Sequence, residues 1–230
     1  MFGSTGPGPY DLHFRVFGIP VRVQPFFWLV AALFGDHNLR LGMDFMLGWI
    51  LVFFISILVH ELGHALTAMY FGFPVQIVLY GMGGQAQYVP RGRYGRGQSL
   101  AITLAGPGAG FALAAIGYIL LNQLQPALAN APMRTQQLIH ETLSDLVLVN
   151  VFWSIMNLFP VLPLDGGRVC QDVLTFVSPR QGQDWTHWVG VIVGGLVGAM
   201  FLSIGAMWGG ILFVMMAAQN YMMLQGPRWR

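Results

Sequence analysis

The residues best suited to chemistry in this sequence lie in the segment His60-Glu61-Leu62-Gly63-His64. Histidines four positions apart share one face of an α-helix, so both imidazoles can bind a single divalent cation. The glutamate beside them can take a proton from a water molecule that the cation activates. The pattern is typical of a hydrolytic zinc site, with His60 and His64 as ligands and Glu61 as the base.

A long apolar run precedes this segment. Residues 45–59 carry no charge and a single hydroxyl, that of Ser56. Glu61 would therefore lie about 24 Å along a helix that begins at Phe45. An ionisable side chain at such a depth costs several kcal/mol unless it faces the interior of a helix bundle and has a partner. A metal ion is the natural partner, and a hydrogen-bonded polar cluster between helices is the alternative.

Two histidines leave a catalytic zinc ion one protein ligand short, because such ions usually have three. Metzincins have a glycine and a histidine three and six residues after the second histidine, where this chain has Thr67 and Tyr70. The only other glutamate, Glu141, is expected at the far end of its own span. An aspartate is therefore the remaining candidate.

Asp165 is the aspartate that the local sequence presents best. Pro160 and Pro163 break the helix expected before it, and the glycine pair that follows it frees the backbone. Asp172 is a possible rival, but we expect it to cap a solvated helix. Cys170, the single cysteine, is expected to be a packing residue.

The composition places these residues in a membrane protein. Of the 230 residues, 55% are hydrophobic and 9% are charged, whereas a soluble domain has roughly a quarter charged residues. A water-soluble globule is therefore excluded. The formal net charge of +2 is too dilute to form a basic face for nucleic acid.

Six stretches are apolar enough to be candidate membrane spans. They cover about 23–34, 45–71, 99–121, 138–164 and two short spans within 187–224, joined near 203–206. Six spans place both termini on one side. Nine of the eleven arginines fall on that side, and the exceptions are Arg40 and Arg134, so we expect both termini to be cytoplasmic.

Residues 75–80 and 85–89 predict two strands of a hairpin between the second and third spans. The glycine-rich segment 81–84 supplies the positive φ angles that a tight reversal needs. In the fourth span, Asp145 and Asn150 are expected to form hydrogen bonds across helices. Four further histidines are expected near span ends, with an interfacial or solvated role: His13, His37, His140 and His187.

Three motifs follow one another across residues 60–167. They are His60-Glu-x-x-His64, Ala105-Gly-Pro107 at the opening of the third predicted span, and Asn157-x-x-Pro-x-x-Pro163-Leu-Asp165-Gly. Together they resemble the site-2 protease family of intramembrane zinc metalloproteases. The flanking spans resemble that family only in their number and hydrophobicity.

The resemblance implies that His60, His64 and Asp165 bind one Zn²⁺ and that Glu61 is the catalytic base. It implies that Asn157 is a polar residue close to the site, which holds the substrate or the oxyanion. It also implies that the hairpin re-enters the membrane and pairs with an unwound substrate strand. Many relatives carry a PDZ or CBS domain, and we expect neither here.

We therefore expect residues 1–230 to form a single integral-membrane metalloprotease domain, all-α apart from the small hairpin. It would hydrolyse peptide bonds in or near transmembrane segments of other membrane proteins, in regulated intramembrane proteolysis. Its location would be the cell (inner) membrane. The alternative is a non-catalytic binder or chaperone of membrane proteins that retains the protease fold. A metal transporter is less favoured, because few other carboxylates lie within the spans.

Overall fold

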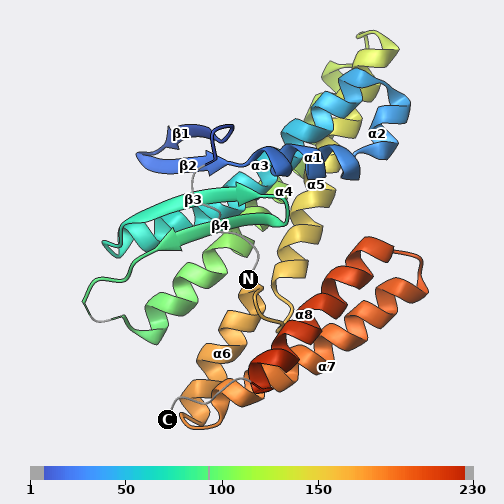
Figure 1. Cartoon of the computed structure of the whole chain (residues 1–230). Helices are drawn as coiled ribbons and strands as arrows, with labels where there is room; N and C mark the ends of the chain where they lie inside the picture. The colour runs from blue at the N-terminus through green and yellow to red at the C-terminus, as the bar shows by residue number, and fades with distance from the viewer. Residues whose placement is uncertain (1–7, 93, 226–230) are drawn as a thin grey trace. The chain divides into compact units, whose positions relative to one another are not determined.

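The computed structural model describes residues 8–92 and 94–225 (Figure 1). The strands are β1 (Leu12–Val16), β2 (Ile19–Val23), β3 (Val75–Tyr80) and β4 (Gly83–Tyr88). The helices are α1 (Pro25–Phe34), α2 (Asp36–Leu41), α3 (Met43–Tyr70), α4 (Arg96–Ala127), α5 (Met133–Asn157), α6 (Asp165–Val177), α7 (Gly182–Ser203) and α8 (Met207–Gln225). The chain forms two compact units: residues 1–94 with 105–154, and residues 95–104 with 155–230.

Five helices of the described part of the chain are long and apolar enough to cross a membrane: α3, α4, α5, α7 and α8. The mostly helical membrane fold is thus confirmed, and the predicted split of residues 187–224 occurs at 204–206. The sixth span is not confirmed. β2 takes up residues 19–23, and α1 runs for 10 residues from Pro25 to its cap at Gly35. Such a helix is about 15 Å long, half the thickness of a bilayer core.

The predicted hairpin is present as β3 and β4, within a sheet that is larger than expected. Four strands lie in the order β1-β2-β3-β4. β1 and β2 form a second hairpin, whose turn at Phe17 and Gly18 has positive φ angles of 50° and 80°. β2 then pairs in parallel with β3, with Val21 opposite Ile77. This leaves β4 as an edge strand of the sheet.

The core of the first unit lies between this sheet and α3. In Figure 1 the helix runs alongside β3 and β4, and it contacts both strands. Ile57 of α3, Leu79 of β3, Val23 of β2 and Phe27 of α1 are fully buried together. Because the apolar face of α3 packs on the sheet, the turn that carries the histidines is fixed against β4.

Polar side chains join α5 to the elements around it, as expected for Asp145 and Asn150. The Asn150 Nδ2 atom donates to Ser56 Oγ of α3 at 2.8 Å. The Asn38 Nδ2 atom of α2 donates to Asp145 Oδ2 at 2.6 Å. Inside an apolar bundle such bonds contribute about 0.6 kcal/mol each on average, and they fix the helix register.

The second unit contains α6 and the helix pair α7 and α8, which lie side by side (Figure 1). Its core includes Val161, which precedes α6, and Phe213 of α8. Asp172 lies in the interior of α6, so the prediction that it caps a helix is wrong. His187 lies in the second turn of α7, near a span end as expected, but its side chain is buried and therefore not solvated.

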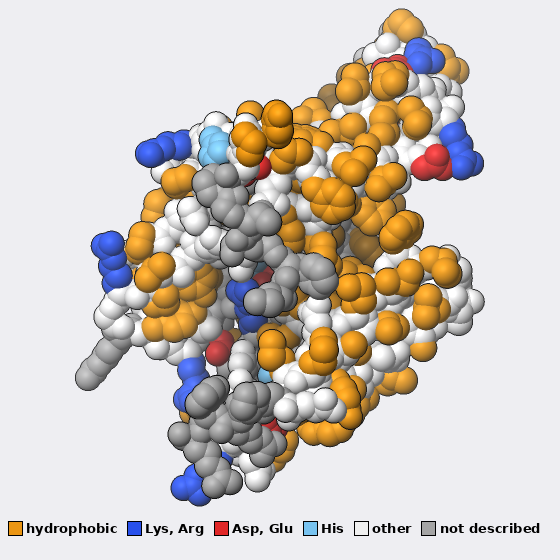
Figure 2. Space-filling view, viewed as in Figure 1, with side chains coloured by type: hydrophobic (Ala, Val, Ile, Leu, Met, Phe, Trp, Pro, Cys, Tyr) orange, Lys and Arg blue, Asp and Glu red, His pale blue; other side chains and the backbone are white. Residues whose placement is uncertain are grey.

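Apolar side chains dominate the visible faces of α7 and α8, with few charged groups among them (Figure 2). They include Ile192 and Leu196 of α7 and Met222 of α8, which expose more than half of their surface. A soluble protein rarely exposes so large an apolar surface. These helix faces are suited to contact with lipid, in keeping with a multi-pass membrane protein.

Candidate metal centre

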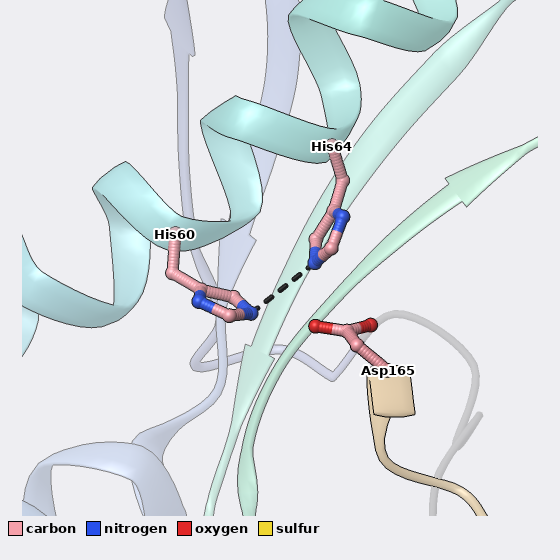
Figure 3. Close-up of side chains that lie close together, drawn as sticks. All are labelled: His60, His64 and Asp165. Atoms are coloured by element: carbon pink, nitrogen blue, oxygen red, sulfur yellow. Dashed lines mark hydrogen bonds between the residues drawn. The ribbon is translucent and has the colours of Figure 1, made fainter. Parts of the chain in front are cut away.

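Helix α3 places His60 and His64 on one buried face. They are one helical turn apart, and their Nε2 atoms point toward each other at a separation of 3.2 Å (Figure 3). Two nitrogens that bind the same zinc ion at about 2.0 Å in a tetrahedron lie about 3.3 Å apart. The imidazoles therefore already have the spacing that a shared zinc ion requires.

The imidazole of His64 lies against a glycine of α4. A Cβ atom at Gly106 would overlap the Nε2 and Cε1 atoms of His64. At the preceding position of α3, a Cβ atom at Gly63 would overlap the carbonyl group of Ala105, so α3 and α4 are in backbone contact here. The Ala105-Gly106-Pro107 motif was expected to open the span, but it lies inside α4, which begins at Arg96.

Glu61 lies on the same turn of α3 and faces strand β4. Its side chain is 5% exposed, and a Cβ atom at Gly84 would lie 2.7 Å from its Oε1 atom. The glycine-rich segment was interpreted only as a reversal of the chain. The structure gives Gly84 a second use, because the absence of a side chain there admits the carboxylate of Glu61.

Asp165 is the first residue of α6, after the break that the two prolines predict. Its carboxylate is buried, and one ligand atom from each of His60, His64 and Asp165 lies within 4.8 Å of the other two (Figure 3). Two imidazoles and a carboxylate are common ligands of catalytic zinc, so this donor set fits one zinc ion. No other such group of three or more candidate ligands occurs in the described ranges 8–92 and 94–225.

Asn157 is the last residue of α5 and is half-buried, eight positions before Asp165. Sequence reasoning missed Gly84 and Gly106 as determinants of the site. Their signal was visible in part, since both lie in Gly-rich segments that adjoin the predicted helix and hairpin.

Comparison with known proteins identifies the class. The family model for peptidase family M50 matches residues 48–199, and the chain belongs to this family. The resemblance to site-2 proteases is thereby confirmed. The fold is similar to that of the site-2 protease from Methanocaldococcus jannaschii, with a TM-score of 0.60, 22% identity and 94% of each chain covered.

Two curated relatives are similar along much of the sequence. A putative zinc metalloprotease of Synechocystis sp. is 30% identical over 215 residues, covering 84% of this chain and 54% of that protein. A zinc metalloprotease of Methanocaldococcus jannaschii is 26% identical over 163 residues, covering 70% of this chain and 44% of that protein. The chain thus spans about half the length of the curated relatives it matches.

The contact between Gly106 and His64 predicts a selective effect of two neighbouring glycine substitutions. Gly106→Ala should weaken zinc affinity by about 10-fold or more, because the new methyl group displaces the imidazole of His64. Gly108→Ala is the matched control, since a Cβ atom there meets nothing within 4 Å. Competition with a chromogenic chelator, on protein purified in detergent, measures both affinities. Equal affinities for the two variants would contradict the role of Gly106.

Proposed function

We propose that this protein is an intramembrane zinc endopeptidase that hydrolyses peptide bonds in or near transmembrane segments of other membrane proteins. The observation that carries the proposal is the buried group of His60, His64 and Asp165, with the carboxylate of Glu61 on the adjoining helical position. The setting supports it, because α3, which carries three of these residues, is long and apolar enough to cross a membrane.

Zinc is the metal that the donor set and the curated relatives favour. Those relatives are named zinc metalloproteases, and imidazole with carboxylate suits zinc in a peptidase. When bound, the ion would polarise the scissile carbonyl and lower the pKa of the attacking water. His60 and His64 from α3, with Asp165 from α6, would hold it.

Glu61 is the proposed general base. Its carboxylate would take a proton from the attacking water and deliver it to the leaving amine. Gly84 leaves room for that side chain beside β4, and the burial of Glu61 limits its contact with bulk solvent. Asn157 is proposed to hold the substrate or the oxyanion, a role that rests on its place in the family motif.

Strand β4 is the proposed binding edge for substrate. Its neighbour on one side is β3, and the Val89 N–H, just after β4, donates to the Pro74 carbonyl on the β3 side. Backbone groups alternate along an antiparallel strand, so those of Gly84 and Ala86 point away from β3. An unwound substrate segment could add to this edge, close to Glu61, and regain hydrogen bonds lost from its helix.

The proposed location is the cell (inner) membrane. The C-terminal end of α3, which leads into the β3–β4 hairpin, would lie on the cytoplasmic side. If the long helices cross alternately, Arg91, Arg96 and Arg180 would lie on that side, and Arg40 and Arg134 on the other. β2 pairs with β3, so the N-terminal strands lie beside the β3–β4 hairpin and would be on the same side of the membrane. This holds although α1 is too short to span the membrane. Both termini are therefore proposed to be cytoplasmic.

Replacement of Glu61 tests the proposed reaction. Glu61→Gln should lower the turnover of single-span substrates by at least about 100-fold, because the amide cannot accept the proton. Its zinc content should stay at the wild-type level, since Glu61 is not a proposed ligand. Glu141→Gln, at the only other glutamate, is the matched control and should cleave normally.

Cleavage is measured on a panel of single-span substrates in liposomes, with zinc quantified in the same preparations. Equal turnover by the wild type and Glu61→Gln would exclude Glu61 as the base. A wild-type protein that holds zinc and binds these substrates but cleaves none would support the non-catalytic binder instead.

The edge of β4 is tested by removing one outward N–H group. Ala86→Pro removes this donor and leaves the β3–β4 hydrogen bonds intact, because the Ala86 N–H points away from β3. Cleavage of helical transmembrane substrates should fall by about 10-fold or more, with zinc retained. Ala86→Val adds similar bulk at this buried position and keeps the N–H, so it should cleave clearly faster than Ala86→Pro. Equal rates for Pro and Val variants would contradict strand addition.

Membrane orientation is tested by thiol labelling. In a Cys170→Ala background, a cysteine at exposed Val89 should react with an impermeant maleimide only after the cells are permeabilised. A cysteine at exposed Asn130, between α4 and α5, should react on intact cells. The reverse pattern would contradict the orientation derived from the arginines.

A further inference from the structure

Asn220 in α8 bonds to the chain segment that leads into α6. Its side chain is 2% exposed and lies in a largely apolar helix pair. The Nδ2 atom donates to the carbonyl of Leu162 at 2.8 Å and to that of Met216 at 2.9 Å. Met216 is one turn earlier in α8, whereas Leu162 lies 58 positions away, in the loop between α5 and α6.

His187 fixes the orientation of this carboxamide. Both N–H groups of Asn220 are taken by carbonyl oxygens, which can only accept, so the Oδ1 atom must face the remaining partner. That partner is His187 of α7, whose Nδ1 atom lies 3.0 Å from Oδ1 and therefore carries the proton. Gly190, one turn along α7, leaves the space, because a Cβ atom there would lie 2.7 Å from Asn220 Oδ1.

The loop held by Asn220 is packed directly against the first turn of α6. A Cβ atom at Gly166 would overlap the carbonyl of Leu158, and one at Gly167 would lie 2.5 Å from the backbone nitrogen of Leu162. Val161, within the loop, is fully buried. A shift of the Leu162 backbone would therefore move the start of α6, where Asp165 is the first residue.

A role confined to joining α7 and α8 would not need the bond to Leu162. Asn220 could join the helix pair through His187 and the Met216 carbonyl alone. Instead, one of its two donors is directed out of the pair to a loop carbonyl three residues before Asp165. Placing a carboxamide and an imidazole in an apolar interior is unfavourable unless every polar atom is bonded, and this arrangement satisfies the whole carboxamide.

We propose that Asn220, oriented by His187, is a positioning residue that holds the Leu162 carbonyl and thereby sets the place of the Asp165 carboxylate at the metal centre. This inference rests on the proposed function, in which Asp165 is the third zinc ligand. Asn220 acts through the loop backbone and has no direct contact with metal or substrate. Loss of its bond to Leu162 lets the first turn of α6 drift and weakens one of the three metal bonds.

The test is a double-mutant cycle on zinc affinity. Asn220→Leu keeps the branched shape and removes all three hydrogen bonds, and it should weaken zinc binding by about 10-fold or more in the otherwise wild-type protein. In an Asp165→Asn background the same change should have no further effect, because the group it positions is already gone. Thr186→Val is the control: it removes a buried bond to the Gly182 carbonyl within α7 and should leave zinc affinity unchanged.

A second readout and a second variant complete the test. With Co²⁺ in place of zinc, the visible absorption of Asn220→Leu should shift toward that of Asp165→Asn. If Asn220→Leu fails to fold, Gly190→Ala serves in its place, since its methyl group displaces the Asn220 carboxamide and removes no polar group.

Wild-type zinc affinity in Asn220→Leu, or an equal loss of affinity in both backgrounds, would overturn the positioning role and leave the proposed function intact. A wild-type protein that binds no zinc would overturn the proposed function itself.

Discussion

The structure depends on keeping two imidazoles and two carboxylates buried inside apolar helices. Such groups are expensive in this setting unless each has a partner of opposite character. His60, Glu61, His64 and Asp165 are all buried, and three of them present ligand atoms within 4.8 Å of one another. A divalent cation would satisfy this arrangement, because it would compensate the carboxylates and take the lone pairs of both imidazoles. The proposed centre would therefore stabilise the fold as well as perform the proposed chemistry.

Glycine residues allow the backbone of neighbouring elements to lie close to these side chains. The imidazole of His64 rests on Gly106 of α4, and the carboxylate of Glu61 rests on Gly84 of β4. Gly166 and Gly167 let the loop before α6 fold against its first turn. In each case a Cβ atom would occupy the place of a functional group or of the backbone that carries one. The high glycine content thus reflects close contacts at the site as well as helix packing.

The sequence predicted the features that depend on local patterns. The spacing of His60 and His64, the helix break before Asp165 and the hairpin of β3 and β4 are all set by neighbouring residues. It did not predict β1 and β2, because the parallel pairing of β2 with β3 joins segments more than 50 residues apart. The same limit applies to Gly84, Gly106 and Asn220, whose contacts arise only in the folded chain. The first expected span is not confirmed for a related reason: α1 has only 10 residues, and it cannot extend toward the N-terminus because residues 19–23 form β2 of the sheet.

Zinc K-edge X-ray absorption of the purified protein reads the ligands of the proposed centre. We expect one zinc ion bound by two imidazole nitrogens and a carboxylate oxygen at about 2.0–2.2 Å, with a changed spectrum in Asp165→Asn. A sulfur contribution at about 2.3 Å would assign the ion to Cys170, the only cysteine, and contradict this ligand set. So would a zinc spectrum that the removal of Asp165 leaves unchanged.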